Sequence, residues 1–237
     1  MTDTAAEFSV AGAEEARRII VMMGAPGAGK GTQAEHLAKL MHLAHVSTGK
    51  LFRDAISGQL PLGAKVRSHV ESGSLVPDEV TVKVVDERIH LGDAASGVIL
   101  DGFPRTCAQA VALDEILARH GEAVTAALYI EVGIEELLVR LTGRRVCALD
   151  DHHVYHVVAR PPRKEGVCDI DGAELVQRND DKPATVQSRL DRQLPPMYEV
   201  IDYYTDSGVL FGVQGDQPAA DVTEDLLRAL AAASRSR

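Results

Sequence analysis

The chain has 237 residues, of which 45% are hydrophobic and 25% charged, a composition that excludes wholesale disorder and suits one large domain with small insertions. Its 25 Lys and Arg against 35 Asp and Glu give a net charge of −10, which argues against a general nucleic-acid partner. No apolar run approaches the ~20 residues needed to cross a bilayer, so no membrane partner is expected, and three cysteines cannot form a closed disulfide framework.

The two ends of the chain are predicted to be solvated tails. Residues 1–16 are small, polar and acidic, without the apolar centre of a signal peptide, and they are too acidic for a typical mitochondrial presequence. Residues 231–237 end in Ser-Arg-Ser-Arg and are predicted to fray. With no secretory pattern, a cytoplasmic location is expected.

Short apolar runs without polar–apolar alternation recur along the chain, each bounded by turn residues or charges. This pattern is typical of strands that are covered on both faces. The runs are residues 19–23, 44–46, 98–100, 126–130 and 209–213. Apolar residues at helical spacing accompany them, from Thr32 to Leu40, from Val111 to Leu117 and from Val222 to Leu230. The sequence therefore predicts an α/β fold built on a doubly wound, five-stranded parallel sheet.

Two stretches interrupt this alternation and are predicted to be small domains inserted into the core. Residues 47–76 follow the second strand with a compact helical pattern. Residues 144–181 contain two adjacent prolines, three His, two Cys and many charges. The predicted core then comprises residues 17–46, 77–143 and 182–230.

A glycine-rich segment follows the first predicted strand and opens the first helix. Residues 24–32 read G-A-P-G-A-G-K-G-T, the spacing of a phosphate-binding loop with Gly31 interposed before Thr32. Backbone N–H groups of such a loop curl around an anion at a helix N-terminus. Lys30 is expected to reach the β- and γ-phosphates and Thr32 to lie near a metal ion, whereas the bland interpretation is a turn without a ligand. The residues predicted to bind the triphosphate here are Gly27, Ala28, Gly29, Lys30, Gly31 and Thr32.

Charged residues also follow the second and third strands. Arg53 lies in S-T-G-K-L-F-R, and Arg105 lies in D-G-F-P-R-T, with Gln109 one turn later. Ligands of open α/β sheets bind beyond the carboxyl ends of the strands, where both segments are expected. Each guanidinium can bind a phosphate through two hydrogen bonds. Asp101, at a strand end, is predicted to hold Mg²⁺ through water, together with Thr32.

Taken together, these segments resemble the adenylate kinases that carry a long lid, from about residue 18 to about residue 230. The most specific parts are G-A-P-G-A-G-K-G-T, D-G-F-P-R-T and G-R-R-V, followed by Y-H, P-P, E-G and R-x-D-D. The resemblance implies reversible phosphoryl transfer from Mg-ATP to AMP, giving two ADP, by a monomer. It also implies that residues 47–76 bind AMP and that residues 144–181 form the lid over ATP.

The resemblance implies a role for individual residues as well. The residues matching those that clamp the transferring phosphoryl group are Lys30, Arg105, Arg144, Arg178 and Arg189. On the ATP side, beyond the phosphate loop, the matching residues are Arg140, Arg144, Tyr155 and Gln217. On the AMP side they are Thr48, Arg53, Val76, Gly102, Arg105, Gln109, Arg178 and Arg189. No general base is expected, because the AMP phosphate is already a competent nucleophile.

Two departures from the family pattern stand out. Lys50 occupies a position where the family usually has an acid; we interpret it as a solvated helix residue with little effect. In the lid, some members hold zinc with a C-x2-C and a C-x2-[CD] pair, and others have a polar hydrogen-bond network instead. Here the pairs are Cys147/Asp150 and Cys168/Asp171, and one extra residue lies between Asp150 and Tyr155.

Three states of this lid corner are compatible with the sequence. Two thiolates and two carboxylates can hold zinc tetrahedrally, with His152 or His153 as a substitute for Asp150. A metal-free polar network and a disulfide are the alternatives. We favour the network over zinc, because carboxylates bind zinc less tightly than thiolates and the extra residue disturbs the first pair.

Three other functions compete with ATP:AMP transfer. The first is a GTP:AMP phosphotransferase, which has the same parts and a different donor base. A UMP/CMP kinase fits less well because its lid is short. A nucleotide-binding regulatory protein without activity is disfavoured, because such a protein should have lost some of the arginines that match the family's phosphate-binding residues, and none is missing.

Overall fold

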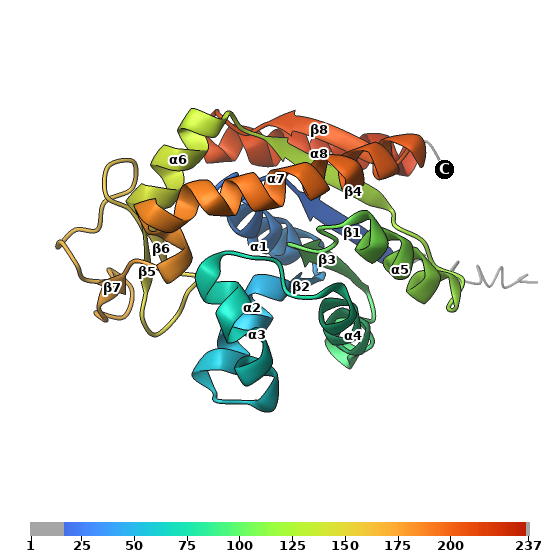
Figure 1. Ribbon diagram of the computed structural model, residues 1–237. Coiled ribbons are helices and arrows are strands. Elements are labelled where there is room, and N and C mark those ends of the chain that lie inside the picture. Colours follow the sequence, from blue (N-terminus) through green and yellow to red (C-terminus); the bar gives the residue numbers. More distant parts are fainter. Residues whose placement is uncertain (1–16, 236–237) are drawn as a thin grey trace, which may run out of the picture.

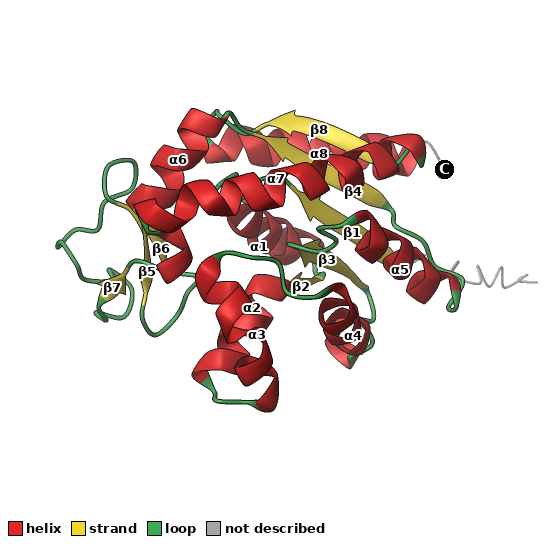
Figure 2. Cartoon of the chain, viewed as in Figure 1, coloured by secondary structure: helices red, strands yellow, loops and turns green. Residues whose placement is uncertain are grey.

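The computed structural model describes residues 17–235. Its centre is a five-stranded, all-parallel sheet, which confirms the predicted fold class (Figures 1 and 2). In spatial order the strands are β2 (Ala44–Ser47), β3 (Gly97–Asp101), β1 (Arg18–Met23), β4 (Ala126–Glu131) and β8 (Leu210–Gln214). Each predicted strand is present within one or two residues of its expected ends.

Helices cover both faces of the sheet (Figure 2). The core helices are α1 (Lys30–Met41), α4 (Asp78–Ile89), α5 (Cys107–Ala118), α6 (Ile134–Gly143), α7 (Pro183–Asp206) and α8 (Ala219–Arg235). Alternate residues of β1 enter different apolar clusters: Ile20 packs with residues of α1, α6 and α8, and Ile19 with residues of α4 and α5. Burial on both faces explains why the strands are uniformly apolar.

The first insertion forms a helical hairpin of α2 (Thr48–Ser57) and α3 (Pro61–Ser72), below the sheet in Figure 1. Phe52, Val66 and Val76 form an apolar cluster of its own. Gly63 lets the two helices approach closely, because a Cβ there would lie 2.1 Å from the Ala55 carbonyl oxygen. The helix α3 ends at Gly73, whose φ of 71° is left-handed and suits glycine.

The second insertion, which we call the lid, lies to the left in Figure 1. It is a three-stranded antiparallel sheet of β5 (Arg144–Cys147), β6 (Val154–His156) and β7 (Leu175–Val176). A short 3-10 helix, Asn179–Asp181, leads from it into α7, and another, Gly92–Ala94, precedes β3. The lid also has a small buried cluster, formed by Cys147, Tyr155, Cys168 and Leu175.

One predicted boundary is wrong. Residues 231–235 belong to the last turns of α8 and are not a tail, since Ala233 is buried against the core one turn after Leu230. The predicted tail at residues 1–16 lies outside the described residues, as do residues 236–237. Within residues 17–235, no helix combines the length and the apolar character that crossing a membrane requires.

Candidate active site

The phosphate loop connects β1 to α1 in the way its sequence predicts. Gly24, Gly27 and Gly29 have φ values of 143°, 88° and 96°, which glycine adopts without strain. At Gly24 a Cβ would also lie 2.7 Å from the Ile130 carbonyl oxygen, so β4 packs against the loop backbone. The loop therefore depends on these glycines both for its curvature and for its close contact with the neighbouring strand.

Lys30 begins α1 and turns back over the loop. Its Nζ donates a hydrogen bond to the Ala25 carbonyl oxygen over 2.9 Å. Burial is the largest cause that lowers the pKa of Lys30; with the opposing charge of Asp101 and the charges of Arg105, Arg189 and Arg144 included, the pKa falls to about 7. The cations around Lys30 make this point of the molecule strongly attractive for an anion.

Asp101 ends β3 next to the loop and faces the same cavity as Lys30 and Thr32. Burial opposes its ionisation, but the contact with His45 and the charge of Lys30 prevail and lower the pKa of Asp101 to about 2. The Nε2 of His45 lies 3.5 Å from an Asp101 carboxylate oxygen. A carboxylate and a hydroxyl lining a phosphate cavity suit Mg²⁺, which prefers oxygen ligands and retains several waters.

A buried acid anchors two of the predicted catalytic arginines. Asp181 is fully buried, and its carboxylate accepts hydrogen bonds from Arg144 Nε and Nη2 over 2.7 and 2.6 Å. Arg189 Nη1 donates to the same carboxylate over 3.1 Å and pairs with Asp180 at 2.9 Å. Arg144 comes from the lid and Arg189 from α7, so Asp181 holds two elements together at the cavity.

The predicted acceptor residues other than Arg178 line a second cavity, between the first insertion and the core, whereas Arg178 lines the triphosphate cavity. The lining of the second cavity includes Thr48, Arg53, Val76, Gly102, Arg105, Gln109 and Arg189. Thr48 Oγ1 donates to the Gly102 carbonyl oxygen over 2.9 Å, which ties α2 to the end of β3. Burial and the nearby Arg189 lower the pKa of Arg105 to about 10, so this guanidinium remains charged at neutral pH.

Arg53 and Arg178 approach each other from opposite insertions. Arg53 is on α2 of the first insertion, and Arg178 follows β7 of the lid. Both lie against the carboxylate of Asp151, a lid residue that sequence reasoning did not select. Burial, Arg53 and Arg144 lower the pKa of Arg178 to about 10, which leaves it cationic at neutral pH.

The predicted donor-base residues lie around the end of α6. Arg140 Nη2 donates to the Gly215 carbonyl oxygen over 2.9 Å and so holds the loop after β8 against α6. The Gln217 side chain turns to Asp225, with a hydrogen bond of 2.7 Å. The Tyr155 side chain does not line the triphosphate cavity: it is buried in the lid, where its hydroxyl accepts from the Asp169 amide over 2.8 Å.

In the lid corner the fourth residue is His153, one of the two predicted substitutes for Asp150. Cys147, Cys168 and Asp171 come together as expected, but His153 completes the group in place of Asp150, with all four ligand atoms within 4.8 Å of one another. The Nδ1 of His153 lies 3.0 Å from Asp171 and 3.5 Å from the Cys168 sulfur. Asp150 lies on the other side of the His153 ring, with its Oδ2 3.7 Å from Nε2. Both cysteines are free, so the disulfide alternative is not the state described here.

Sequence reasoning also missed Gln193, which is buried on α7. Its Oε1 accepts from Arg105 Nη1 over 2.9 Å, and its Nε2 donates to the Gly73 carbonyl oxygen over 2.7 Å. The available signal was its position four residues after Arg189, which places both on one face of a helix.

The parallel sheet, the phosphate loop and the two insertions with their converging arginines define a nucleoside monophosphate kinase of the phosphate-loop class. The sequence model described as adenylate kinase matches residues 22–209. The chain is 47% identical to an adenylate kinase of Staphylococcus aureus over 208 residues, which cover 88% of this chain and 96% of the relative. It is 44% identical to one of Caldicellulosiruptor bescii over 211 residues, or 89% of this chain and 98% of the relative.

A third relative, an adenylate kinase of Streptomyces coelicolor, is 46% identical over 211 residues, which cover 89% of this chain and 97% of the relative. The chain belongs to the adenylate kinase family. It is an enzyme whose reaction is phosphoryl transfer between ATP and AMP, and the GTP-dependent alternative is not favoured.

Proposed function

We propose that Lys30 and the arginines around it perform this transfer without a general base. The observation that carries the proposal is the convergence of Lys30 and Arg189, together with Arg144 of the lid, on the cavity that holds Asp101. In phosphoryl transfer the protein contributes alignment and charge neutralisation, for which these fixed cations are suited. We assign Arg105, Arg144, Arg178 and Arg189, together with Lys30, to the transferring group.

The two cavities divide the substrates. We assign the triphosphate cavity, with the loop from Gly27 to Thr32, to ATP and the cavity under α2 and α3 to AMP. Arg140 and the loop around Gln217 would flank the donor base, and Tyr155 could contribute only through its backbone. Because all these residues come from one chain, the site is complete without a second copy, and we propose that the protein is a monomer. We propose separately that it is located in the cytoplasm.

Mg²⁺ fits the donor cavity, where Asp101 and Thr32 would hold it through water. The ion, when bound, neutralises phosphate charge as ATP reacts. Lys30, Arg144 and Arg189 orient the phosphates, and the lid and first insertion exclude water that would otherwise accept the phosphoryl group.

We also propose that the lid corner holds a structural Zn²⁺ through Cys147, His153, Cys168 and Asp171. The sequence favoured a metal-free network over zinc because two carboxylates bind zinc weakly. In the structure the imidazole of His153 takes the place of the Asp150 carboxylate, so only one carboxylate remains in the ligand set. Ligand atoms of a tetrahedral zinc site are separated by roughly 3.5 Å, which the 3.0 to 3.5 Å contacts of His153 approach. The set leaves no open ligand position, so the metal would support the lid and take no part in the chemistry.

A coupled assay with ATP or GTP as donor and AMP, CMP, UMP or GMP as acceptor tests the substrates, with ATP plus AMP expected to be fastest. Paired variants test the residues. Lys30→Ala is expected to reduce turnover by about 10²- to 10³-fold or more, because it removes a charge that acts on the transferring group. Arg53→Ala is expected mainly to raise the KM for AMP; equal weakening of ATP and AMP would contradict the assignment of the first insertion to the acceptor.

A further inference from the structure

Asp151 lies in the loop between β5 and β6. Its Oδ2 lies 2.8 Å from both Nε and Nη2 of Arg53, so the carboxylate occupies one edge of that guanidinium. The same oxygen accepts from Arg178 Nη2 over 3.1 Å, and Oδ1 lies 3.6 Å from Lys50 Nζ. One carboxylate of the lid is thus surrounded by three cations.

These contacts are shielded from water more than ordinary surface ion pairs. The side chains of Asp151, Arg53 and Arg178 are 20%, 30% and 16% exposed. Burial opposes ionisation of Asp151, but Arg53 and Arg178 prevail and lower its pKa below the ordinary value, so it is a carboxylate at neutral pH. Next to it, His152 contacts Glu35 of α1 at 3.2 Å, which fastens the same loop to the core.

The sequence positions of Lys50 and Asp151 are complementary. The ammonium group of Lys50 attracts the Asp151 carboxylate, which an acid at this position would repel. Lys50 also lies 3.3 Å from Asp54 on its own helix, so it remains anchored if Asp151 moves. Lys50 and Asp151 therefore form a further contact between α2 and the lid.

We propose that Asp151 is an internal counter-anion that holds Arg53 and Arg178 and competes with the phosphate of AMP for them. The inference rests on the proposed role of these two arginines in binding that phosphate. A guanidinium binds a phosphate through the same pair of N–H groups that here bind the carboxylate, so the two anions exclude each other at that edge of Arg53. Binding of AMP then releases the lid loop from α2. Asp151 lowers the affinity for AMP, because the phosphate must displace it, but it also holds Arg53 and Arg178 in position before AMP binds.

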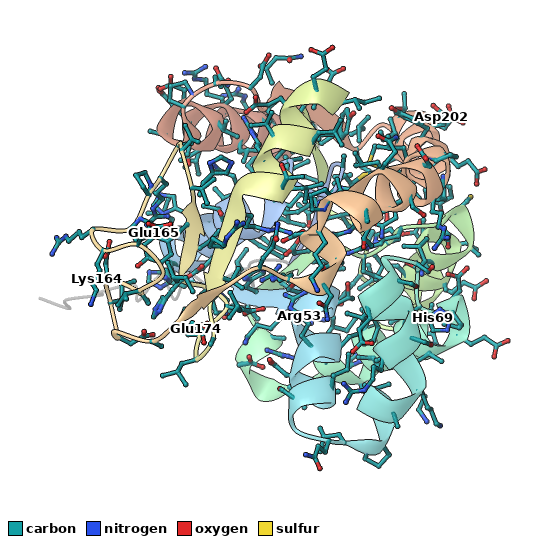
Figure 3. The ribbon with its side chains drawn as sticks, turned by 60° about the vertical axis from the view of Figure 1, so that its left-hand side comes forward. Arg53, His69, Lys164, Glu165, Glu174 and Asp202 are labelled. Atoms are coloured by element: carbon teal, nitrogen blue, oxygen red, sulfur yellow. The ribbon has the colours of Figure 1, made fainter. Side chains whose placement is uncertain are left out.

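The experiment compares Asp151→Asn with Glu174→Gln, which removes the same charge from another part of the lid (Figure 3). Direct calorimetric binding of AMP is expected to be about three- to tenfold tighter in Asp151→Asn and unchanged in Glu174→Gln. Without nucleotide, the radius of gyration of Asp151→Asn from solution X-ray scattering is expected to exceed that of the wild type, because the lid has lost its contact with α2. Asp151→Glu is expected to restore both quantities toward the wild-type values.

A second background separates this inference from a general effect of charge. In Arg53→Ala the further change Asp151→Asn is expected to improve AMP affinity less than it does in the wild type; an equal improvement overturns the inference. AMP affinity within twofold of the wild type in Asp151→Asn, combined with a loss in Arg53→Ala, overturns the inference and leaves the proposed function intact. Unchanged AMP affinity in Arg53→Ala overturns the role of Arg53 and the inference with it.

Discussion

At the scale of single residues, Lys30 shows how burial prepares a site for an anion. Its ammonium group is buried among arginines, and this lowers its pKa to about 7. The cation is held there by the start of α1 and by its hydrogen bond to the carbonyl of Ala25. A phosphate placed beside it supplies the negative charge that the buried ammonium lacks.

This predicts that binding of ATP is coupled to proton uptake. Bound phosphates raise the pKa of Lys30 above about 7, so between pH 7.5 and 9 the complex holds more protons than the free protein. Affinity should fall as pH rises across that range, by at most about tenfold per pH unit. Calorimetry in two buffers of different ionisation enthalpy measures the uptake, which Lys30→Met should abolish; no uptake in the wild type would refute the assignment.

Gln193 is the second residue whose role is read from its contacts. It joins Arg105 to the carbonyl of Gly73, at the turn where the first insertion meets α7. Gln193→Leu should raise the KM for AMP by about tenfold, because a buried hydrogen bond to a charged group is lost, while the KM for ATP changes little. Steady-state kinetics of Gln187→Leu, an exposed glutamine of the same helix, provide the control, and a similar rise in both variants would show that Gln193 has no special part.

At the scale of elements, the lid depends on one corner for its cohesion. Its three strands are only two to four residues long, and its buried cluster comprises Cys147, Tyr155, Cys168 and Leu175. So small a core supplies little stability by itself, which is why small domains often rely on a metal or a cross-link. The first insertion differs, because two helices and the apolar residues of α4 support its cluster.

Metal analysis of protein purified without chelator is therefore expected to find one zinc per chain. His153→Ala should lose the metal together with thermal stability, whereas Asp150→Asn should retain it, since Asp150 lies outside the group of four. Cys168→Ser should also lower the melting temperature. Activity at moderate temperature should survive in all three variants, because Arg144 and Arg178 make the proposed catalytic contacts. If His153→Ala retained its full zinc content, the fourth ligand would be Asp150 and not His153.

At the scale of the whole molecule, an acidic protein brings a group of cations together at one site. The net charge is −10, yet arginines from the first insertion, the lid and α7 meet beside the phosphate loop. Asp151 and Asp181 form ion pairs with these arginines, and Asp101 lies beside Lys30 and His45. Convergence of charge from three separated segments explains why overall composition says little about the ligand.

The sequence by itself determined the parallel sheet, the phosphate loop and the segments that carry the arginines. These features arise from short-range rules: unalternating apolar runs for buried strands, and glycines where the loop curves around an anion. The helices α4, α6 and α7 were not identified individually, because their apolar residues are spaced among many charges and α7 contains two internal prolines.

The tertiary structure alone decided which residues distant in the sequence meet. It selected His153 among the possible fourth residues of the lid corner, joined Gln193 to Arg105 and Gly73, and placed Asp151 between Arg53 and Arg178. These partners are separated by 15 to 120 residues along the chain, and no local pattern encodes such a distance. Each contact depends on how a loop turns and how closely two elements pack, which the summed interactions of the folded chain determine.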